Sequence, residues 1–265
     1  MHEVMAYDTR RLAPLLTITG VTKRFGGVEA LAGCTLAVGE GSITGLIGPN
    51  GAGKTTLFNV ISGLTRADGG QIGLGADRLD RLSAHAIARR GVGRTFQIPR
   101  PLGRMTVLEN VLVYAHDQPG EGLTRVFVAP RRVRAEEART RERAHAILDS
   151  VDLAHLAGAR AETLSGGQKK LLELARALMS DPRIILLDEP GAGVNPTLMR
   201  SLVETIQALR AAGRTFLLIE HDMDLVTELC DPVIVMAQGR TLMEGPFAEI
   251  RRDPRVLEAY LGSAT

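Results

Sequence analysis

Tryptophan is absent from this chain of 265 residues, and aromatic residues make up only 3% of it. Its two cysteines, Cys34 and Cys230, lie far apart and form no CxxC or Cys/His ligand spacing. The missing tryptophan says nothing about function, but the cysteine spacing predicts neither a zinc site nor a disulfide framework. Such cysteine usage is typical of a protein of the reducing cytoplasm.

Long hydrophobic runs are also missing. The longest uncharged apolar stretches, such as residues 184–187 and 216–219, are far shorter than the roughly 20 residues that a membrane-spanning helix needs. Residues 1–11 contain charged side chains and no apolar centre, so we expect no signal peptide there. The sequence therefore predicts a chain that does not cross a membrane by itself.

The chain has no marked excess of charge of one sign. Its 32 basic and 30 acidic residues give a formal net charge of +2, so charge alone does not indicate a nucleic-acid partner. Hydrophobic residues make up 45% of the chain and charged residues 23%, which is ordinary for a globular protein. A chain of this length is long for one domain and short for two.

The order of periodic segments predicts an α/β fold. An N-terminal β region is followed by a helical stretch from about residue 83 to 180, in which Thr106 and Glu109 have the spacing of a capping box. Strands and helices then alternate, which predicts a mostly parallel sheet flanked by helices. Expected strands lie at 15–19, 35–38, 42–47, 71–74, 184–187, 215–219 and 232–236; expected helices at 54–64, 169–179, 196–212, 222–229 and, as short helices, within 246–261.

A glycine-rich segment lies between the strand at 42–47 and the helix that begins at Lys54. It matches GxxxxGK[ST], the phosphate-binding P-loop, in which backbone N–H groups surround the β-phosphate at a helix N-terminus. Lys54 is expected to reach the β- and γ-phosphates and Thr55 to bind Mg²⁺. The residues predicted to bind ATP are Gly48, Pro49, Asn50, Gly51, Ala52, Gly53, Lys54, Thr55 and Thr56.

Two adjacent carboxylates end the apolar strand at 184–187. In a phosphate-binding sheet this is the place of the second metal ligand, so Asp188 is expected to hold Mg²⁺ through water. Glu189 follows directly and is placed to activate the attacking water as a general base. A P-loop with this pair does not by itself separate kinases, GTPases, helicases and transporters.

The stretch Leu164-Ser165-Gly166-Gly167-Gln168 precedes a predicted helix, with Ser165 in the position of an N-cap. Together with the P-loop and with the Asp-Glu pair downstream, it resembles the signature sequence of ATP-binding cassette (ABC) ATPases. The resemblance extends over nearly the whole chain. It implies an ABC ATPase fold with an N-terminal antiparallel β subdomain, a P-loop core and a helical signature subdomain.

In that family two subunits dimerise head to tail, and the signature of one subunit closes on ATP held by the other. The resemblance therefore implies nucleotide contacts from Ser165, Gly166, Gly167 and Gln168. It also implies that Gln97 forms the Q-loop that senses Mg²⁺ and the γ-phosphate, and that His221 is the switch histidine. Phe25 matches the aromatic residue that stacks on adenine.

The same resemblance divides the chain. It implies one ABC ATPase domain over 15–265, in which about 15–95 and 182–245 form the core and 96–181 the helical lobe. Residues 246–265 would form C-terminal helices, and residues 1–14 an N-terminal extension.

One departure concerns Asn195, which stands where many members have aspartate in the D-loop.

Shorter stretches resemble the ATP-binding subunits of branched-chain amino acid uptake systems. They include residues 94–97, 105–110, 193–196, 219–223 and the tail 253–261. The resemblance implies two membrane permease subunits, a second ATPase subunit that is identical or a paralogue, and indirectly a substrate-binding protein. The chain would then lie in the cytoplasm on the inner face of the membrane. Another departure is Gly166, where many members of this branch have a bulky residue.

Three other hypotheses remain open on sequence grounds. An ABC exporter of the lipopolysaccharide type would share the P-loop, Phe-Gln and histidine features. A soluble ABC protein that acts on DNA or ribosomes would usually carry two cassettes, coiled-coil arms or basic grooves, which the sequence does not predict. A P-loop small-molecule kinase would leave residues 164–168 unexplained.

Overall fold

The computed structural model describes residues 13–95, 101–115 and 130–261. The chain divides into two compact units. The first consists of Met1–Arg94, Arg183–Gly191 and Gln207–Thr265, and the second of Thr95–Pro182 and Ala192–Ile206. The first unit therefore contains the P-loop, Asp188, Glu189 and His221, whereas the second contains the signature residues.

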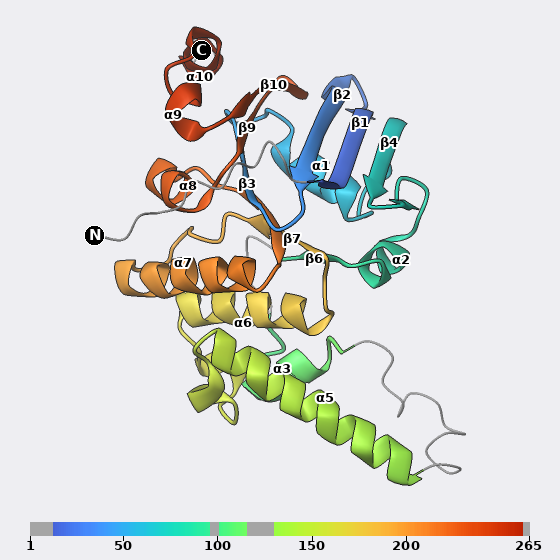
Figure 1. Ribbon diagram of the computed structural model, residues 1–265, viewed down its shortest axis with the longest axis vertical. Helices are drawn as coiled ribbons and strands as arrows, with labels where there is room; N and C mark the ends of the chain where they lie inside the picture. Colours follow the sequence, from blue (N-terminus) through green and yellow to red (C-terminus); the bar gives the residue numbers. More distant parts are fainter. Residues whose placement is uncertain (1–12, 96–100, 116–129, 262–265) are drawn as a thin grey trace. The chain divides into compact units, whose positions relative to one another are not determined.

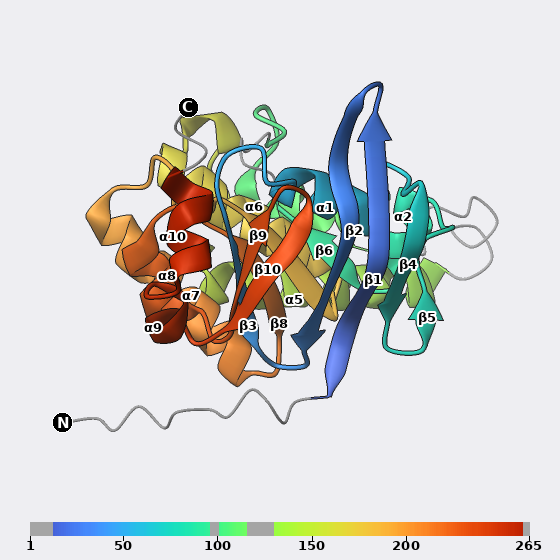
Figure 2. The same cartoon turned by 90° about the horizontal axis from the view of Figure 1, so that it is seen from above.

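The first unit begins with an antiparallel sheet in the strand order β2-β1-β4-β5. Its strands are β1 (Pro14–Phe25), β2 (Val28–Gly39), β4 (Gly69–Leu74) and β5 (Asp77–Arg78). The first two form the long hairpin seen in Figure 2, which turns at Gly26 and Gly27. Both strands are longer than the sequence predicted. Register shifts near Val21 interrupt the alternation of apolar and polar residues from which a strand is predicted.

A second sheet of the first unit has the order β10-β9-β3-β8-β7-β6. Its strands are β3 (Ile43–Ile47), β6 (Val92–Arg94), β7 (Ile184–Asp188), β8 (Thr215–Ile219), β9 (Val233–Ala237) and β10 (Arg240–Gly245). All pairs are parallel except β9 with β10, which form a hairpin that turns at Gln238 and Gly239. The mostly parallel sheet is thus confirmed. The helical pattern expected from about residue 83 was wrong at β6, an edge strand too short to show a period.

Helices of the first unit are α1 (Lys54–Ile61), α2 (Ala84–Arg89), α8 (Met223–Leu229), α9 (Phe247–Ile250) and α10 (Pro254–Leu261). Buried side chains from both sheets and from α1 form one hydrophobic cluster, which includes Leu16, Phe58 and Leu186. The helix that follows the P-loop is therefore held in the core on its apolar side. This burial fixes the direction of its N-terminus relative to β3, at whose end the P-loop begins (Figure 1).

The second unit is helical. It contains α3 (Val107–Leu112), α5 (Pro130–Ser150), the short 3-10 helices η3 (Ala154–Leu156) and η4 (Ala161–Thr163), and α6 (Gly166–Met179). The helix α7 (Pro196–Ala211) belongs to this unit as far as Ile206. In Figure 1, α3, α5 and α6 lie against one another. The predicted capping box of Thr106 and Glu109 is confirmed at the start of α3.

Membrane-spanning helices are not found in the part of the chain that the structure describes, since none of its helices is both long and apolar enough.

Candidate nucleotide site

The P-loop connects β3 to α1, and two of its glycines are required by close backbone contacts. Gly48 has φ 150°, and a Cβ added there would lie 2.1 Å from the carbonyl oxygen of Met236 on β9. Gly53 has φ 99°, and its Cβ would lie 2.4 Å from the carbonyl oxygen of Ala30 on β2. No other residue fits at these two positions, so neighbouring strands of both sheets determine the course of the loop.

The N-terminus of α1, unlike those of α3 and α6, has no side-chain cap. Its N-cap residue, Gly53, offers no side-chain hydrogen bond, and its first turn contains no acidic residue. By contrast, α3 and α6 each begin with a full capping box. Backbone N–H groups at the start of a helix that lack internal partners, together with the positive end of the helix dipole, form a site for an anion such as phosphate.

Lys54, the first residue of α1, is only 6% exposed. Its ammonium group donates hydrogen bonds to the carbonyl oxygens of Gly48 at 2.6 Å and Pro49 at 2.9 Å. Burial lowers the pKa of Lys54, while the charges of Glu189 and Asp188 act in the opposite direction. The predicted cation and the two predicted carboxylates therefore share one electrostatic environment.

Asp188 ends β7 and is paired with an arginine that the sequence prediction gave no role. Arg94, at the end of β6, lies 3.2 Å from the Asp188 carboxylate and also donates to Asn59 at 2.8 Å. Burial raises the pKa of Asp188, and the charge and hydrogen bond of Arg94 oppose that rise. The available signal was the position of Arg94, three residues before Gln97. The salt bridge itself required knowledge of β6.

Glu189 and His221 are brought together from the ends of neighbouring strands, β7 and β8. The Nε2 atom of His221 lies 2.8 Å from Oε1 of Glu189. Glu189 has φ 48°, in the left-handed region, which costs a non-glycine residue about 1 to 3 kcal/mol. A strained carboxylate in contact with a histidine at the end of a parallel sheet is a typical arrangement for acid–base chemistry.

Three residues are expected to bind magnesium. Thr55 lies in the first turn of α1, Asp188 lies at the end of β7, and Gln97 is outside the described residues. Their chemistry fits the ion, because Mg²⁺ prefers hard oxygen ligands and is usually held by one or two protein groups together with phosphate oxygens. Thr55 follows Lys54 in the sequence. The charge of Asp188 acts on the Lys54 ammonium group. The predicted metal ligands are therefore compatible with a magnesium–nucleotide complex.

Phe25 ends β1 opposite Val28 in the hairpin and is 51% exposed. Its ring lies 5.3 Å from the Nζ atom of Lys23, measured to the ring centroid. The close approach of Ala30 to Gly53 brings the same hairpin beside the P-loop. Phe25 is therefore a surface aromatic residue on an element that contacts the P-loop, and not a core residue.

The signature residues belong to the second unit. The helix begins at Gly166 and not at Lys169 as predicted, because Ser165 and Gln168 form a reciprocal capping box one turn earlier. Gln168 N–H donates to Oγ of Ser165 at 3.3 Å, and Ser165 N–H donates to Oε1 of Gln168 at 3.0 Å. The predicted N-cap role of Ser165 is thus confirmed, and Gly166 and Gly167 lie in the first helical turn.

The two signature glycines differ in the space around them. A Cβ at Gly167 would lie 2.5 Å from Cδ1 of Leu198, whereas a Cβ at Gly166 would meet nothing within 4 Å. A larger side chain therefore has space at Gly166 but not at Gly167. Asn195 caps the start of α7, since its Oδ1 accepts from the Leu198 N–H at 2.9 Å. Gln97 lies outside the described residues.

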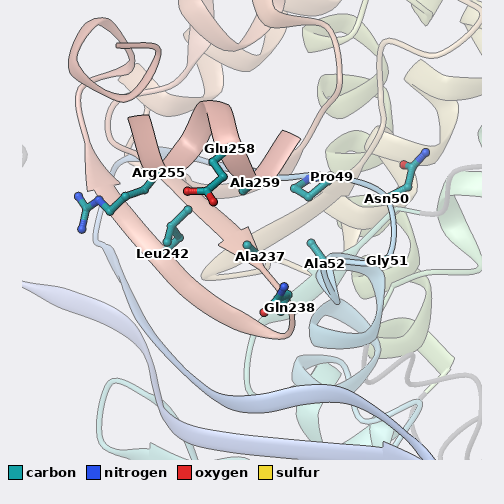
Figure 3. Close-up of a pocket in the computed structure, with 10 residues that line it drawn as sticks. All are labelled: Pro49, Asn50, Gly51, Ala52, Ala237, Gln238, Leu242, Arg255, Glu258 and Ala259. Carbon is teal, nitrogen blue, oxygen red and sulfur yellow. The ribbon is translucent and has the colours of Figure 1, made fainter. Parts of the chain in front are cut away.

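A pocket of about 520 Å³ adjoins the P-loop (Figure 3). In Figure 3, Glu258 and Ala259 of α10 face the P-loop residues Pro49 and Ala52 from the opposite wall. Tyr260 of the same helix is close to the P-loop as well. Burial raises the pKa of its phenol, and a hydrogen bond with the Gly48 backbone acts against that rise. The C-terminal helix therefore supports the P-loop from outside.

A phosphate-binding loop with an uncapped helix behind it, a buried lysine and two carboxylates at the end of the adjoining sheet define the class of P-loop nucleoside triphosphatases. Other proteins identify the family. The sequence model of the ABC transporter family matches residues 31–192, and that of the branched-chain amino acid ATP-binding cassette transporter matches residues 240–265.

Individual relatives agree with the family models. The chain is 44% identical to the probable branched-chain amino acid transport ATP-binding protein LivG of Archaeoglobus fulgidus, over 94% of this chain and 96% of the relative. A crystal structure of an ABC transporter cassette in its ADP conformation is similar, with a TM-score of 0.81 and 39% identity, over 94% of this chain and 99% of that one. A dimeric cassette bound to ADP and phosphate has a TM-score of 0.71 and 25% identity, over 87% and 98%.

The chain therefore belongs to the ABC transporter ATP-binding family, whose members are nucleotide-binding ATPases coupled to transport.

Proposed function

We propose that this chain hydrolyses ATP to drive an importer of branched-chain amino acids or related small solutes. The observation that carries this proposal is the pair formed by Glu189 and His221, in which Nε2 of His221 lies 2.8 Å from Oε1 of Glu189. The charge of Glu189 also acts on the ammonium group of Lys54. The pair supplies a base beside a phosphate site. The proposed catalytic unit is one ABC ATPase domain over residues 15–265, preceded by an extension at 1–14.

ATP is bound in this proposal by the P-loop residues from Gly48 to Thr56, with the adenine stacked on Phe25. Lys54 turns its ammonium group from the carbonyls of Gly48 and Pro49 to the β- and γ-phosphates. Thr55, Asp188 and Gln97 would hold Mg²⁺, which neutralises phosphate charge when bound. Arg94 keeps the Asp188 carboxylate in place.

Hydrolysis requires a water molecule in line with the γ-phosphate. Glu189 orients this water and accepts its proton as the P–O bond to ADP breaks. His221 donates a hydrogen bond to the same carboxylate from Nε2, which restricts its orientation, and contacts the γ-phosphate side of the site.

The active site is shared between two subunits in this account. Ser165, Gly166, Gly167 and Gln168 bind the γ-phosphate of ATP held by the partner, using the N-terminus of α6. The dimeric state of the similar cassette bound to ADP and phosphate supports this arrangement. Two ATP molecules that bind only the closed dimer drive closure, and hydrolysis reverses it.

The substrate proposal depends on the C-terminal segment. Residues 240–265 match the branched-chain amino acid cassette model, and the similar LivG protein is named for that transport. The proposed partners are two permease subunits, an identical or paralogous ATPase subunit and, indirectly, a substrate-binding protein. The chain would then act at the inner face of the cell membrane without contacting the transported amino acid.

Reconstitution tests this function directly. The chain is co-purified with the permeases and binding protein encoded beside its gene and placed in vesicles with internal ATP and Mg²⁺. We expect uptake of radiolabelled leucine that unlabelled isoleucine and valine inhibit, and that Lys54→Ala abolishes. ATP-driven efflux in place of uptake would contradict the importer proposal. Leucine uptake that unlabelled leucine, isoleucine and valine all fail to inhibit would contradict the proposed substrate.

A further inference from the structure

A buried carboxylate, Glu220, joins the two loops that carry Glu189 and His221. It lies between the end of β8 and His221 and is only 4% exposed. One carboxylate oxygen accepts the Gly191 N–H at 2.7 Å, and the other accepts the N–H of His221 at 3.0 Å. The Asp222 N–H lies 3.4 Å from that second oxygen.

These contacts cross the boundary between the loop after β7 and the loop after β8. Glu189 itself donates its backbone N–H to the carbonyl oxygen of Ile219 at 2.9 Å. The residue two positions later, Gly191, is held by Glu220. Glu189 is therefore fixed on both sides to the segment that carries His221, and its left-handed backbone can persist only where neighbouring contacts impose it.

Burial of a charged group is unfavourable unless hydrogen bonds satisfy it. Within the part of the chain that the structure describes, Glu220 meets this condition with three backbone donors in the two loops of the candidate site. The negative charge of Glu220 also acts on Cys230. The pKa of the Cys230 thiol is raised to about 12, mainly by burial and further by the charges of Glu220 and Asp231. The Glu220 carboxylate thus connects the two loops that carry Glu189 and His221 through hydrogen bonds to the backbone of each.

We infer that Glu220 is a positioning residue for hydrolysis, which holds Glu189 and His221 at their 2.8 Å separation by binding the backbone of both loops. It touches neither the P-loop glycines nor Phe25 in the described contacts, so it acts on turnover and not on ATP binding. The inference rests on the proposed roles of Glu189 and His221.

The test is a double-mutant cycle with Glu220→Gln and Glu189→Gln. In Glu220→Gln an NH₂ group replaces one carboxylate oxygen. Because this group cannot accept a hydrogen bond, the backbone N–H on that side loses its acceptor and one loop is released. We expect ATP affinity and KM within about twofold of wild type and a kcat about 10- to 100-fold lower, the scale of a misplaced catalytic group. In the Glu189→Gln background, Glu220→Gln should cause a much smaller loss than in the wild type, because part of its effect passes through the position of Glu189 relative to His221.

Asp222→Asn is the matched control. It makes the same acid-to-amide change in the same loop, but the Asp222 side chain caps α8 through the N–H groups of Asp224 and Leu225. Asparagine caps a helix about as well as aspartate, so kcat should stay within about twofold.

Two results overturn the inference: an unchanged kcat for Glu220→Gln, or losses that multiply in the double mutant. If Glu220→Gln does not fold, Glu220→Asp keeps the charge on a shorter side chain and carries the same expectations. Normal turnover by Glu189→Gln would instead overturn the proposed function, because the base itself would be wrong.

Discussion

At the scale of single residues, the P-loop depends on glycine where backbone meets backbone. The carbonyl oxygen of Met236 occupies the space of a Cβ at Gly48, so the strand β9 prevents any side chain there. Gly158 is a useful contrast, because nothing lies within 4 Å of its hypothetical Cβ and its φ is not in the left-handed range.

Gly48→Ala should therefore lower the free energy of unfolding by about 1 to 3 kcal/mol, since it adds a clash to an unfavourable φ. ATP affinity should fall in the same variant, because the loop must move away from Met236. Gly158→Ala should leave both quantities nearly unchanged. Denaturant unfolding and ATP titration measure the two effects, and equal stability of Gly48→Ala and wild type would contradict the described loop.

Glu189 provides the second prediction at this scale. Glu189→Gln keeps the shape of the side chain but cannot accept a proton, so turnover should fall at least about 10²-fold while ATP binding is retained. Glu204→Gln, at an exposed position of α7, is the control for the same chemical change. Steady-state hydrolysis and nucleotide binding are measured on folded samples, and normal hydrolysis by Glu189→Gln would remove Glu189 from the mechanism.

At the scale of elements, the first hairpin carries the proposed adenine contact and also meets the P-loop. Phe25 is half exposed at the end of β1, on a hairpin that meets Gly53 through Ala30. Phe25→Ala should weaken ATP binding by about 0.5 to 1.5 kcal/mol, whereas Phe25→Tyr should have almost no effect, because both rings can stack.

Val28→Ala serves as the control, since Val28 pairs with Phe25 across the hairpin and is also exposed. If Val28→Ala weakens binding as much as Phe25→Ala, the loss comes from the hairpin and not from stacking. Isothermal titration with ATP separates these outcomes. Equal affinities of Phe25→Ala and wild type would exclude the adenine contact.

Elements with a strong local signal were predicted well from the sequence. The buried strand β8 occupies the predicted residues, and the caps at Thr106 and Ser165 were visible in the side chains themselves. Elements without a period were not predicted: β6 has only three residues, and register shifts conceal the length of β1. Contacts between distant segments were equally hidden, including Arg94 with Asp188 and Tyr260 with Gly48.

The candidate site shows the same division. Motif spacing predicted Lys54, Asp188 and Glu189, because each stands at the start or end of a regular element, and the resemblance to ABC ATPases implied His221. The partners that orient them could not be predicted, because they depend on strand order. Glu220 reaches Gly191 only because β7 and β8 are neighbours in the sheet.

At the scale of the whole molecule, the residues proposed for the shared site are divided between the two units. The P-loop and the carboxylates belong to the first unit and the signature to the second. If a second subunit completes each site, two variants that damage different halves should compensate in a mixed dimer. Lys54→Ala damages the phosphate half, and Ser165→Arg fills the γ-phosphate contact of the signature half.

The most direct measurement is ATP hydrolysis by a mixed dimer of Ser165→Arg and Lys54→Ala, isolated through two different affinity tags. Such a dimer has one site with an intact P-loop and an intact signature, and one site damaged in both. We expect the mixed dimer to hydrolyse more ATP than either variant alone, while Ser165→Arg still binds ATP at its own P-loop. Full hydrolysis by monomeric Ser165→Arg, or no recovery in the mixed dimer, would contradict the shared site.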